Sequence, residues 1–328
     1  MSLLELNDLQ VDLPVSGQYR RILQGVTFSL APGAALGLVG ESGSGKSVTL
    51  KSIMRLLPVQ ARVRGEIVYQ AQSVLTLRKR ALRTLRAEHV AMVHQDPRTA
   101  INPVRTIGDF MTEGIGRGSD AWDRAASALA EVGIRDARRR FAQYPHQLSG
   151  GLLQRVMIAG SLIHHPKLVL ADEPTTALDM TSQADVVAVL ARLQAERHLG
   201  LVFVTHDLDL AAAVTDTLAV MYAGVIVEYG PTARIQDRPL HPYTAALLAS
   251  RPRLDRRTRL QTIPGRPVAA YETGTGCVFA TRCPLATDRC RTERPALADH
   301  GGRLAACHRV GDSEFDDAVV RARKAATP

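Results

Sequence analysis

The chain has 328 residues, of which 45% are hydrophobic and 22% are charged. This balance is typical of a folded globular protein and excludes a disordered one, and the length suits one large domain or two ordinary ones. The sequence has no apolar run of the roughly 18–20 residues that a membrane-spanning helix needs, and its first residues lack the features of a signal peptide, so we expect a protein that is neither membrane-embedded nor secreted. The net charge is +9, and most of the excess lies from Arg251 onward, which predicts a basic surface there.

The first part of the chain predicts strands that lead into a glycine-rich loop. Apolar and polar residues alternate over residues 4–13, which predicts a half-buried strand, and a second strand is expected over residues 25–30. Residues 34–39 are apolar without alternation, as in a buried parallel strand. The glycine-rich sequence Gly40–Ser47 follows at once, and a helix is then expected from Val48 to Leu57.

Strand and helix patterns alternate through the middle of the chain. Buried strands are expected at residues 89–94, 168–171, 201–205 and 218–222, and amphipathic helices at residues 120–132, 149–164, 181–198 and 207–214. This alternation predicts an α/β fold with a parallel sheet. No strand pattern occurs between about residues 97 and 160, so a helical subdomain is expected to be inserted there. After about Gly230 the chain becomes rich in proline and arginine, which predicts an appended C-terminal module.

The sequence Gly40-Glu41-Ser42-Gly43-Ser44-Gly45-Lys46-Ser47 matches the pattern G-x-x-x-x-G-K-[ST]. Glycines allow such a loop to curl around a phosphate, so that successive backbone N–H groups point at the anion. The helix that follows adds the positive end of its dipole. The Lys46 ammonium is expected to contact the β- and γ-phosphates, and the Ser47 hydroxyl to bind Mg²⁺. By itself the motif predicts only nucleotide binding.

A second element is the sequence Leu168-Val169-Leu170-Ala171-Asp172-Glu173-Pro174. Four apolar residues predict a buried strand whose end delivers two carboxylates to the phosphates. Asp172 is expected to hold Mg²⁺, directly or through water. Glu173 is expected to polarise the attacking water, because phosphoryl transfer depends mostly on positioning and charge stabilisation.

The sequence Leu148-Ser149-Gly150-Gly151-Leu152-Leu153-Gln154-Arg155 resembles the LSGGQ signature of ATP-binding-cassette (ABC) ATPases. A serine at a helix N-cap followed by two glycines can hold a phosphate. The resemblance implies that this loop contacts the γ-phosphate of ATP held by a partner subunit, so that two chains enclose two nucleotides. The fifth position is Leu152 instead of glutamine; the serine hydroxyl and the glycine backbone are retained, and ATP hydrolysis is therefore expected to be retained.

Other elements of the ABC family occur in the expected order. Gln95 in VHQDP resembles the Q-loop glutamine, Asp179 ends a D-loop-like Ala-Leu-Asp, His206 in VTHD resembles the switch histidine, and Tyr19 is the candidate for stacking on adenine. The resemblance implies a catalytic role for Glu173, His206 and Gln95 and a Mg²⁺ site of Ser47, Gln95 and Asp172. It implies ATP contacts from Tyr19, Gly40, Ser42, Gly43, Ser44, Gly45, Lys46, Ser47, Thr49, Ser149, Gly150, Gly151 and Asp179.

Further stretches are similar to one branch of this family, the ATPase subunits of dipeptide, oligopeptide and nickel importers. They are YPHQLSGG, ADEPTTALD, HPYTAALL and GCVFATRCPLATDRCR, followed by Cys307-His308. The fold implied is an α/β P-loop NTPase cassette, with a mixed sheet, an antiparallel β edge and an inserted helical subdomain over about residues 97–160. Residues 1–232 would form this nucleotide-binding domain, and residues 233–328 a small irregular C-terminal extension that contains the cysteines.

The importer resemblance also implies partners and a location. The chain would be one of two ATPase subunits, often a pair of paralogues, on the cytoplasmic face of a bacterial inner membrane. The ATPases would act with two permeases and an extracytoplasmic substrate-binding protein that delivers peptides, or nickel or another metal chelate. ATP would close the ATPase dimer, and hydrolysis would reopen it.

All four cysteines lie in the C-terminal module, as Cys277, Cys283, Cys290 and Cys307, with the spacing C-x5-C-x6-C-x16-C. Clustered cysteines in a cytosolic chain favour metal or cluster ligation over disulfides. The spacing is wider than that of common zinc or ferredoxin motifs. A [4Fe–4S] cluster is the preferred interpretation, because some importers of this family carry one on this extension. A zinc site, with His308 as a further ligand, and metal-free buried thiols remain alternatives.

Two other classes of function compete with an importer. A non-transport cassette ATPase that acts on DNA or ribosomes would suit the basic tail, but such proteins usually carry two cassettes or a long coiled-coil insertion. Few aromatic residues follow Arg251 (Tyr271, Phe279 and Phe315), so nucleic acid is not an expected partner. An exporter ATPase shares the cassette motifs, and only the HPYT and cysteine sequences favour import. The signature sequence excludes a kinase or a small GTPase.

Overall fold

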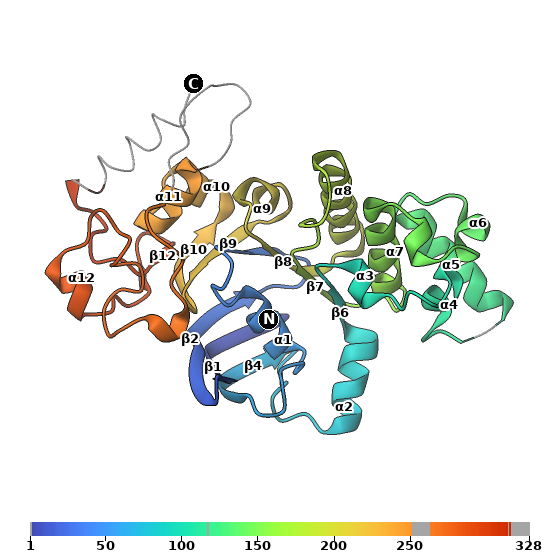
Figure 1. Cartoon of the computed structure of the whole chain (residues 1–328), viewed down its shortest axis with the longest axis horizontal. Coiled ribbons are helices and arrows are strands. Elements are labelled where there is room, and N and C mark those ends of the chain that lie inside the picture. Colours follow the sequence, from blue (N-terminus) through green and yellow to red (C-terminus); the bar gives the residue numbers. More distant parts are fainter. Residues whose placement is uncertain (1, 117, 251–262, 314, 316–328) are drawn as a thin grey trace. The chain divides into compact units, whose positions relative to one another are not determined.

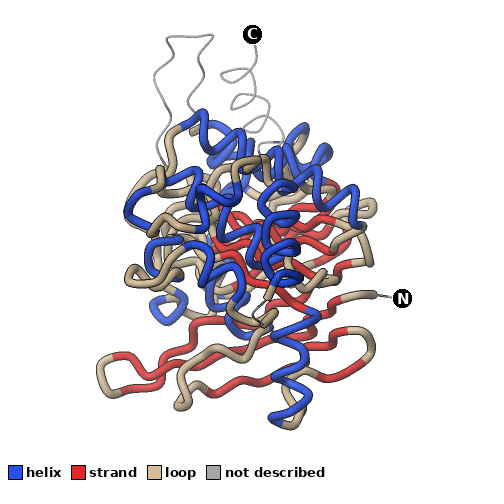
Figure 2. The backbone as a smooth tube through the Cα atoms, turned by 90° about the vertical axis from the view of Figure 1, so that its right-hand side faces the viewer, coloured by secondary structure: helices blue, strands red, loops and turns tan. Residues whose placement is uncertain are grey.

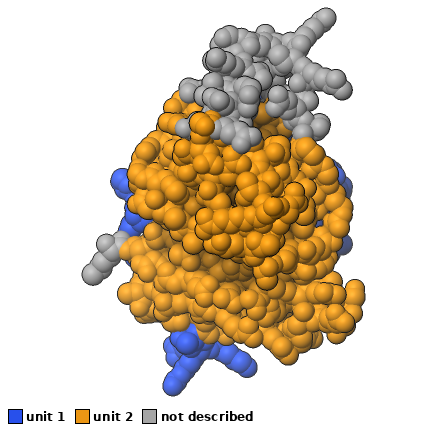
Figure 3. Space-filling model, turned by 90° about the vertical axis from the view of Figure 1, so that its left-hand side faces the viewer, with its two compact units in different colours: residues 1, 31–35, 76–204 blue, residues 2–30, 36–75, 205–328 orange. Residues whose placement is uncertain are grey.

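The computed structural model describes residues 2–116, 118–250, 263–313 and 315. The arginine-rich stretch 251–260, part of the predicted basic surface, lies outside the described residues. The chain divides into two compact units, unit 1 with residues 1, 31–35 and 76–204 and unit 2 with residues 2–30, 36–75 and 205–328 (Figure 3). Unit 2 therefore includes residues from both sides of the domain boundary expected at 232/233. None of the described helices is long and apolar enough to cross a membrane.

The N-terminal part of unit 2 is an antiparallel sheet with the strand order β2-β1-β4-β5, whose long strands form a layer of their own in Figure 2. Its strands are β1 (Leu4–Val15), β2 (Gln18–Leu30), β4 (Arg62–Tyr69) and β5 (Gln72–Ser73). The predicted alternation in β1 is confirmed, because Leu4, Leu6, Leu9 and Val11 are fully buried while the residues between them are not. One face of this sheet therefore packs on the interior.

A second group of strands in unit 2 has the order β11-β12-β10-β9-β3. These strands are β3 (Ala35–Val39), whose first residue belongs to unit 1, β9 (Thr217–Tyr222), β10 (Val225–Pro231), β11 (Ala298–Asp299) and β12 (Leu304–Ala305). Only β3 and β9 are parallel in this group, and the other pairs are antiparallel. All five residues of β3 are buried, as its continuous apolar sequence predicts. The sheet is thus mixed and ends in an antiparallel edge.

Short helices complete unit 2 (Figure 1). They are α1 (Lys46–Ile53), α9 (Leu208–Val214), α10 (Thr232–Asp237), α11 (Pro242–Ala249), α12 (Asp288–Thr292) and the 3₁₀ turn η3 (Ala270–Glu272). One hydrophobic cluster contains Val39 of β3, Tyr222 of β9, Tyr243 of α11 and Phe279 of the cysteine-containing segment. The C-terminal module therefore shares its core with the strand that leads into the glycine-rich loop.

Unit 1 contains three parallel strands in the order β8-β7-β6. These are β6 (Val90–Val93), β7 (Leu168–Asp172) and β8 (Gly200–Thr205), whose last residue belongs to unit 2. Every residue of β7 and β8 is buried, which agrees with their apolar sequences. The carboxyl end of β7 delivers Asp172.

The rest of unit 1 is helical. Its elements are α2 (Lys79–Thr84), the π-helical turn η1 (Leu85–His89), α3 (Pro97–Ala100), α4 (Ile107–Thr112), α5 (Ser119–Glu131), α6 (Ala137–Phe141), the 3₁₀ turn η2 (Pro145–Gln147), α7 (Gly150–Leu162) and α8 (Met180–Arg197). Helix α5 buries Ala121, Ala125 and Leu129, the stripe expected of an amphipathic helix. Trp122 meets Phe141 edge-on, with ring centroids 4.9 Å apart.

The sequence placed most elements well but missed others. The helix expected from Val48 to Leu57 is α1, which begins two residues earlier, after the left-handed Gly45, and ends before Arg55, which has a φ of 50°. Strand β4 escaped detection because charged residues and Gly65 interrupt its apolar pattern. Strand β10 begins directly after Gly224, whose φ is 81°, and the sequence did not predict this strand either.

Candidate nucleotide-binding site

The glycine-rich loop of unit 2 joins β3 to α1. Gly45 is the N-cap of α1 and has a φ of 105°, a backbone conformation that favours glycine. A Cβ at Gly40 would lie 2.1 Å from the Met221 carbonyl oxygen, so only glycine fits there. The Ser44 carbonyl accepts a hydrogen bond from the Gly224 N–H (2.9 Å), which ties the loop to the turn between β9 and β10.

The polar side chains of this loop suit an anionic ligand. The Lys46 side chain is buried, and its Nζ donates to the carbonyl oxygens of Gly40 (2.7 Å) and Glu41 (3.0 Å), so the ammonium lies over the loop. The Ser44 hydroxyl is buried and has no hydrogen-bond partner among the described residues. A bound phosphate would supply the acceptor that this hydroxyl lacks. The loop residues therefore fit a nucleotide phosphate.

Two predicted adenine- or phosphate-binding residues have other contacts. Thr49 is fully buried, and its hydroxyl donates to the Gly45 carbonyl oxygen within the same helix (3.1 Å). Tyr19 lies on β2 and is 45% exposed, and the guanidinium of Arg62 stands 3.6 Å from its ring centroid. One face of this ring is therefore covered by an arginine.

His206 follows β8 and is exposed, and Asp207 beside it caps α9.

Unit 1 carries the predicted acidic pair. The Asp172 side chain is buried at the end of β7. Glu173 has a φ of 44°, a left-handed conformation that costs a residue other than glycine roughly 1–3 kcal/mol. Its N–H donates to the Val204 carbonyl (3.0 Å), and one carboxylate oxygen accepts a hydrogen bond from the Thr176 hydroxyl (2.9 Å). Strain of this kind clusters at functional sites, where the backbone aims a side chain.

The predicted signature loop and D-loop lie together in unit 1. Ser149 is the N-cap of α7, and its hydroxyl accepts from the Leu152 N–H (3.4 Å). A Cβ at Gly151 would lie 2.9 Å from the Ser182 hydroxyl oxygen, so α7 begins against the start of α8. Asp179 caps α8 through the N–H and the hydroxyl of Ser182, and these hydrogen bonds lower the pKa of the Asp179 carboxyl. The structure thus brings Ser149, Gly150, Gly151 and Asp179 into one local cluster.

Gln95 and two glutamines that the sequence did not single out also lie in unit 1. Gln95 is exposed after β6. Gln154 of α7 is buried, and its amide makes a long hydrogen bond to the carbonyl of His94, the residue before Gln95 (3.5 Å). The Gln183 amide donates to the carbonyls of Thr175 and Leu178, both at 3.1 Å, and holds the chain between Glu173 and Asp179. Neither glutamine belongs to a motif, and the only sequence signal is their position, Gln154 three residues after the LSGG-like stretch and Gln183 four residues after Asp179.

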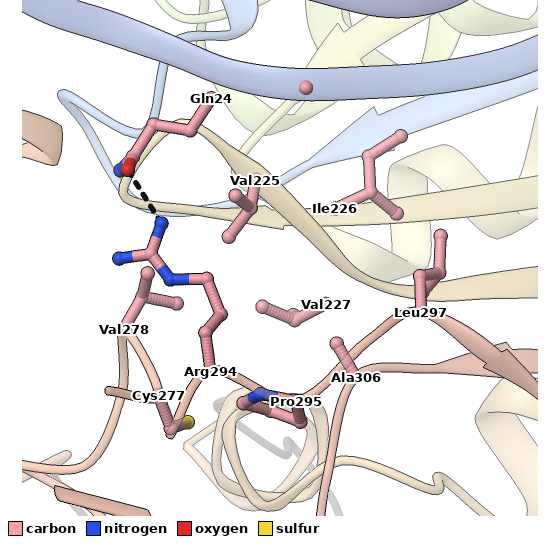
Figure 4. Close-up of a pocket in the computed structure, with 11 residues that line it drawn as sticks. Gln24, Val225, Ile226, Val227, Cys277, Val278, Arg294, Pro295, Leu297 and Ala306 are labelled. Atoms are coloured by element: carbon pink, nitrogen blue, oxygen red, sulfur yellow. Dashed lines mark hydrogen bonds between the residues drawn. The ribbon is translucent and has the colours of Figure 1, made fainter. Parts of the chain in front are cut away.

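The four cysteines are free thiols in the C-terminal part of unit 2. Burial raises the pKa of the Cys277 thiol, that of Cys283 to about 11 and that of Cys307 to about 12, so these thiols are protonated near neutral pH. Cys277 lines a largely apolar cavity of about 150 Å³, together with Gln24 and Arg294 (Figure 4). Among the described residues, no group of three or more His, Cys, Asp and Glu side chains is placed to hold a metal ion. The structure therefore gives no support to the iron–sulfur or zinc ligand set expected from the sequence.

Comparisons with known proteins agree with the motifs. The family described as ABC transporter matches residues 23–176, and the family described as oligopeptide/dipeptide transporter, C-terminal region, matches residues 227–290. The chain is 41% identical to the oligopeptide transport ATP-binding protein OppD of Salmonella typhimurium, over 93% of each chain. It is 42% identical to the dipeptide transport ATP-binding protein DppD of Escherichia coli, over 94% of this chain and 97% of that one.

A solved structure supports the fold. The ATP-binding cassette MJ0796, in a dimeric post-hydrolysis state bound to ADP and phosphate, superposes with a TM-score of 0.62 at 25% identity, over 70% of this chain and 98% of that chain. The chain therefore belongs to the ATP-hydrolysing subunits of the ABC transporter family, in the branch that carries the oligopeptide/dipeptide transporter C-terminal region.

Proposed function

We propose that this subunit hydrolyses ATP to drive the import of dipeptides or oligopeptides. The observation that carries the proposal is similarity over almost the whole chain, at 41% and 42% identity, to proteins named for oligopeptide and dipeptide transport. The C-terminal region characteristic of those transporters is present at residues 227–290. Uptake of labelled peptides by cells that carry or lack the intact transporter tests the substrate class; uptake of nickel or a metal chelate instead would contradict it.

The residues of the two units have distinct proposed roles. Lys46 binds the β- and γ-phosphates of ATP, and the backbone of Gly40–Ser47 surrounds them. Ser47, Asp172 and Gln95 would hold Mg²⁺, and the ion would neutralise phosphate charge. Glu173 orients and polarises the attacking water, while His206 contacts the γ-phosphate. The left-handed backbone at Glu173 and the orphan hydroxyl of Ser44 support these assignments.

Glu173→Gln tests the catalytic assignment. The amide keeps the shape of the side chain but removes the base, so we expect ATP binding to persist and turnover to fall about 10²-fold or more. Steady-state phosphate release and equilibrium ATP binding measure the two quantities separately. Lys46→Ala is the companion variant, in which ATP affinity itself falls. Parental turnover in the Gln variant would contradict the role of Glu173.

Two such subunits are proposed to work as a pair, with Ser149–Gly151 of each chain facing the ATP of the other. The N-caps of α7 and α8 support this, because Ser149 and Asp179 are both exposed and stand at helix N-termini, where the helix dipole favours an anion. The partner is proposed to be a paralogous ATPase. Co-purification from cells that contain the whole transporter, followed by mass spectrometry, distinguishes a paralogue from a second copy of this chain.

We propose that other chains form the path across the membrane, in keeping with the relatives named as ATP-binding proteins of peptide transport. We assign the membrane path to two permeases, the delivery of substrate to an extracytoplasmic binding protein, and the position of this subunit to the cytoplasmic face of the inner membrane. Residues 1–232 are the proposed nucleotide-binding domain and residues 233–328 the proposed extension. Membrane fractionation with and without the permeases tests the location.

The [4Fe–4S] cluster remains a proposal for Cys277, Cys283, Cys290 and Cys307. Their occurrence within 31 residues of a loop-rich segment supports it, whereas the arrangement of the thiols does not. Iron, sulfide and zinc assays on anaerobically purified protein decide between a cluster, zinc and metal-free thiols. No step of the proposed ATPase cycle depends on the outcome.

A further inference from the structure

Glu41 places a carboxylate in the loop that surrounds the nucleotide phosphates. A negative charge beside a polyphosphate opposes its binding unless a cation balances it. Arg282, which lies 241 residues further along the chain, supplies that cation. One guanidinium nitrogen donates to Oε2 of Glu41 at 2.6 Å and the other to Oε1 at 3.2 Å, so the pair is bidentate.

Arg282 is held firmly in place. Its side chain is only 4% exposed, and that of Glu41 is 22% exposed, so the pair is shielded from solvent. The Arg282 Nε donates to the Pro264 carbonyl at 2.7 Å, and a terminal nitrogen donates to the Tyr222 hydroxyl at 3.3 Å. Burial acts to lower the pKa of the Arg282 guanidinium, but its hydrogen bonds to Glu41 and Tyr222 raise that pKa above its ordinary value. The guanidinium therefore stays charged.

A second contact joins the same loop residue to the C-terminal module. The Glu41 N–H donates to the Tyr243 hydroxyl at 2.8 Å, and Tyr243 is fully buried. Its ring packs against those of Tyr222 and Phe279, with centroids 4.7 and 5.3 Å away. Tyr243 thus holds the backbone of Glu41, and Arg282 holds its carboxylate.

We propose that Arg282 is a positioning residue for the ATP-binding loop: it neutralises Glu41 and holds the loop in the shape that accepts phosphates. ATP affinity would then depend on the C-terminal segment that carries Arg282 between Cys277 and Cys283. The inference rests on the proposed function, because it assumes that the loop Gly40–Ser47 binds ATP. It adds a link between that loop and the cysteine-containing segment, which neither the glycine-rich motif nor the cysteine spacing indicates.

The test compares ATP affinity in single and double variants of the full-length chain. Arg282→Ala leaves the Glu41 carboxylate unbalanced beside the phosphates, and we expect the Kd for ATP to rise about tenfold or more. Glu41→Gln alone removes the charge that Arg282 balances, so we expect a smaller rise in Kd than Arg282→Ala causes. In the double variant Arg282→Ala/Glu41→Gln, most of the lost affinity should return, because no charge remains to be balanced.

The dependence on salt gives a second readout that a merely structural role would not produce. Repulsion between Glu41 and the phosphates weakens as ionic strength rises, so the difference in Kd between Arg282→Ala and the parent should shrink between low and high salt. Arg282→Lys keeps the charge but cannot make both guanidinium hydrogen bonds to the Glu41 carboxylate. We expect its Kd for ATP to lie between those of the parent and of Arg282→Ala. It also keeps the test usable if the Ala variant does not fold.

Arg294→Ala is the matched control. Arg294 also belongs to the C-terminal module, but it donates to Oε1 of Gln24 and to the Gly274 carbonyl, both at 2.6 Å, and does not touch the loop (Figure 4). Its loss should lower the melting temperature and leave the Kd for ATP unchanged.

The proposal is overturned if Arg294→Ala weakens ATP binding as much as Arg282→Ala does, or if Glu41→Gln fails to restore affinity in the double variant. The proposal is also overturned if Arg282→Ala has the same Kd for ATP as the parent. This outcome counts when the parental chain binds ATP and the Lys46→Ala variant does not. Failure of the parental chain to bind ATP, or binding that Lys46→Ala leaves intact, contradicts the proposed function instead. The two failures are therefore distinguishable.

Discussion

Single residues of the nucleotide loop have little steric freedom. Gly40 faces the Met221 carbonyl, Gly45 requires a left-handed backbone, and the Lys46 ammonium lies over two loop carbonyls. Each property follows from the need to bring backbone N–H groups close to an anion. Glu173 is likewise constrained by its own backbone, because its left-handed conformation sets the direction of its carboxylate.

The steric demand at Gly40 gives a direct prediction. In Gly40→Ala the new methyl would lie 2.1 Å from the Met221 oxygen and 2.9 Å from the Ser44 hydroxyl, so the loop has to move. We expect a loss of about 1–3 kcal/mol in the free energy of unfolding, and ATP binding that is weakened or abolished. Urea titration and equilibrium binding measure the two effects. Gly274→Ala, where a Cβ meets nothing within 4 Å, should change neither, and equal behaviour of the two variants would contradict this steric account.

At the scale of elements, helix caps place several functional residues. Ser149 begins α7, Asp179 begins α8 and Asp207 begins α9, each with a side-chain oxygen that accepts a backbone N–H. Ser149 and Asp179 are predicted site residues, and Asp207 directly follows His206. The ends of these helices are therefore positioned by residues beside or within the site.

The cap at Asp207 is open to measurement. Its carboxylate accepts from the N–H groups of Asp209 (2.7 Å) and Leu210 (3.2 Å). Asp207→Ala leaves both donors without this partner and is expected to cost about 1 kcal/mol of stability. Asp207→Asn retains a capping oxygen and should lose much less. Chemical unfolding measures both variants, and parental stability in Asp207→Ala would show that the cap contributes nothing.

Strand β10 carries a buried acid with a consequence for pH. Glu228 is fully buried and accepts hydrogen bonds from the N–H groups of Leu240 (2.8 Å) and His241 (3.0 Å), with the Arg303 guanidinium 4.0 Å away. Burial raises the pKa of the Glu228 carboxyl from 4.5 to about 7, against the opposing effect of these hydrogen bonds. At pH values between 4.5 and about 7, the Glu228 carboxyl is therefore deprotonated in the unfolded chain but still protonated in the folded chain.

The sign of the effect follows from that difference. The stability contributed by protonated Glu228 is complete below pH 4.5 and is lost as the pH rises through about 7. Glu228→Gln cannot titrate, so the stability of the parent relative to this variant should fall across that window. Burial lowers the pKa of His241 to about 3, which gives an opposite slope below 6.5 that both proteins share. Unfolding curves at several pH values test this, and a constant difference would refute it.

At the scale of the whole molecule, the C-terminal module is part of the core of unit 2. Phe279 packs against Tyr222 of β9 and Tyr243 of α11, and β12 pairs with β10. The module therefore adds strands β11 and β12 to the sheet, and the Phe279 ring to the hydrophobic cluster that contains Val39 of β3.

This shared core predicts that damage to the module destabilises the cassette. Phe279 is 1% exposed, and Phe279→Ala would leave a cavity that costs about 3–5 kcal/mol. We expect the urea midpoint of unit 2 to fall and ATP affinity to fall with it, because Tyr243 loses a packing partner. Tyr271→Ala, at a residue 41% exposed, is the control and should change the midpoint little. An unchanged midpoint in Phe279→Ala would mean that the module folds independently.

Local sequence determined much of this protein. The glycine loop, the buried strands before Gly40 and Asp172, and the capped starts of α7 and α8 were all predictable, because their patterns span only a few residues. Where local signals were weak, the sequence failed: β4 is interrupted by charges and Gly65. The cysteine spacing suggested a ligand set, but how close the four thiols come depends on the folding of their loops.

Only the tertiary structure decided which distant residues meet. Glu41 and Arg282 lie 241 residues apart, and no periodic pattern records such a pair. The sequence by itself determined that the glycine-rich loop follows a buried strand, and its resemblance to the family predicted which residues contact ATP. The fold decided that the carboxylate inside this loop is neutralised by an arginine of the C-terminal module, because a charge beside phosphates has to be balanced by whichever cation packing brings within hydrogen-bonding distance.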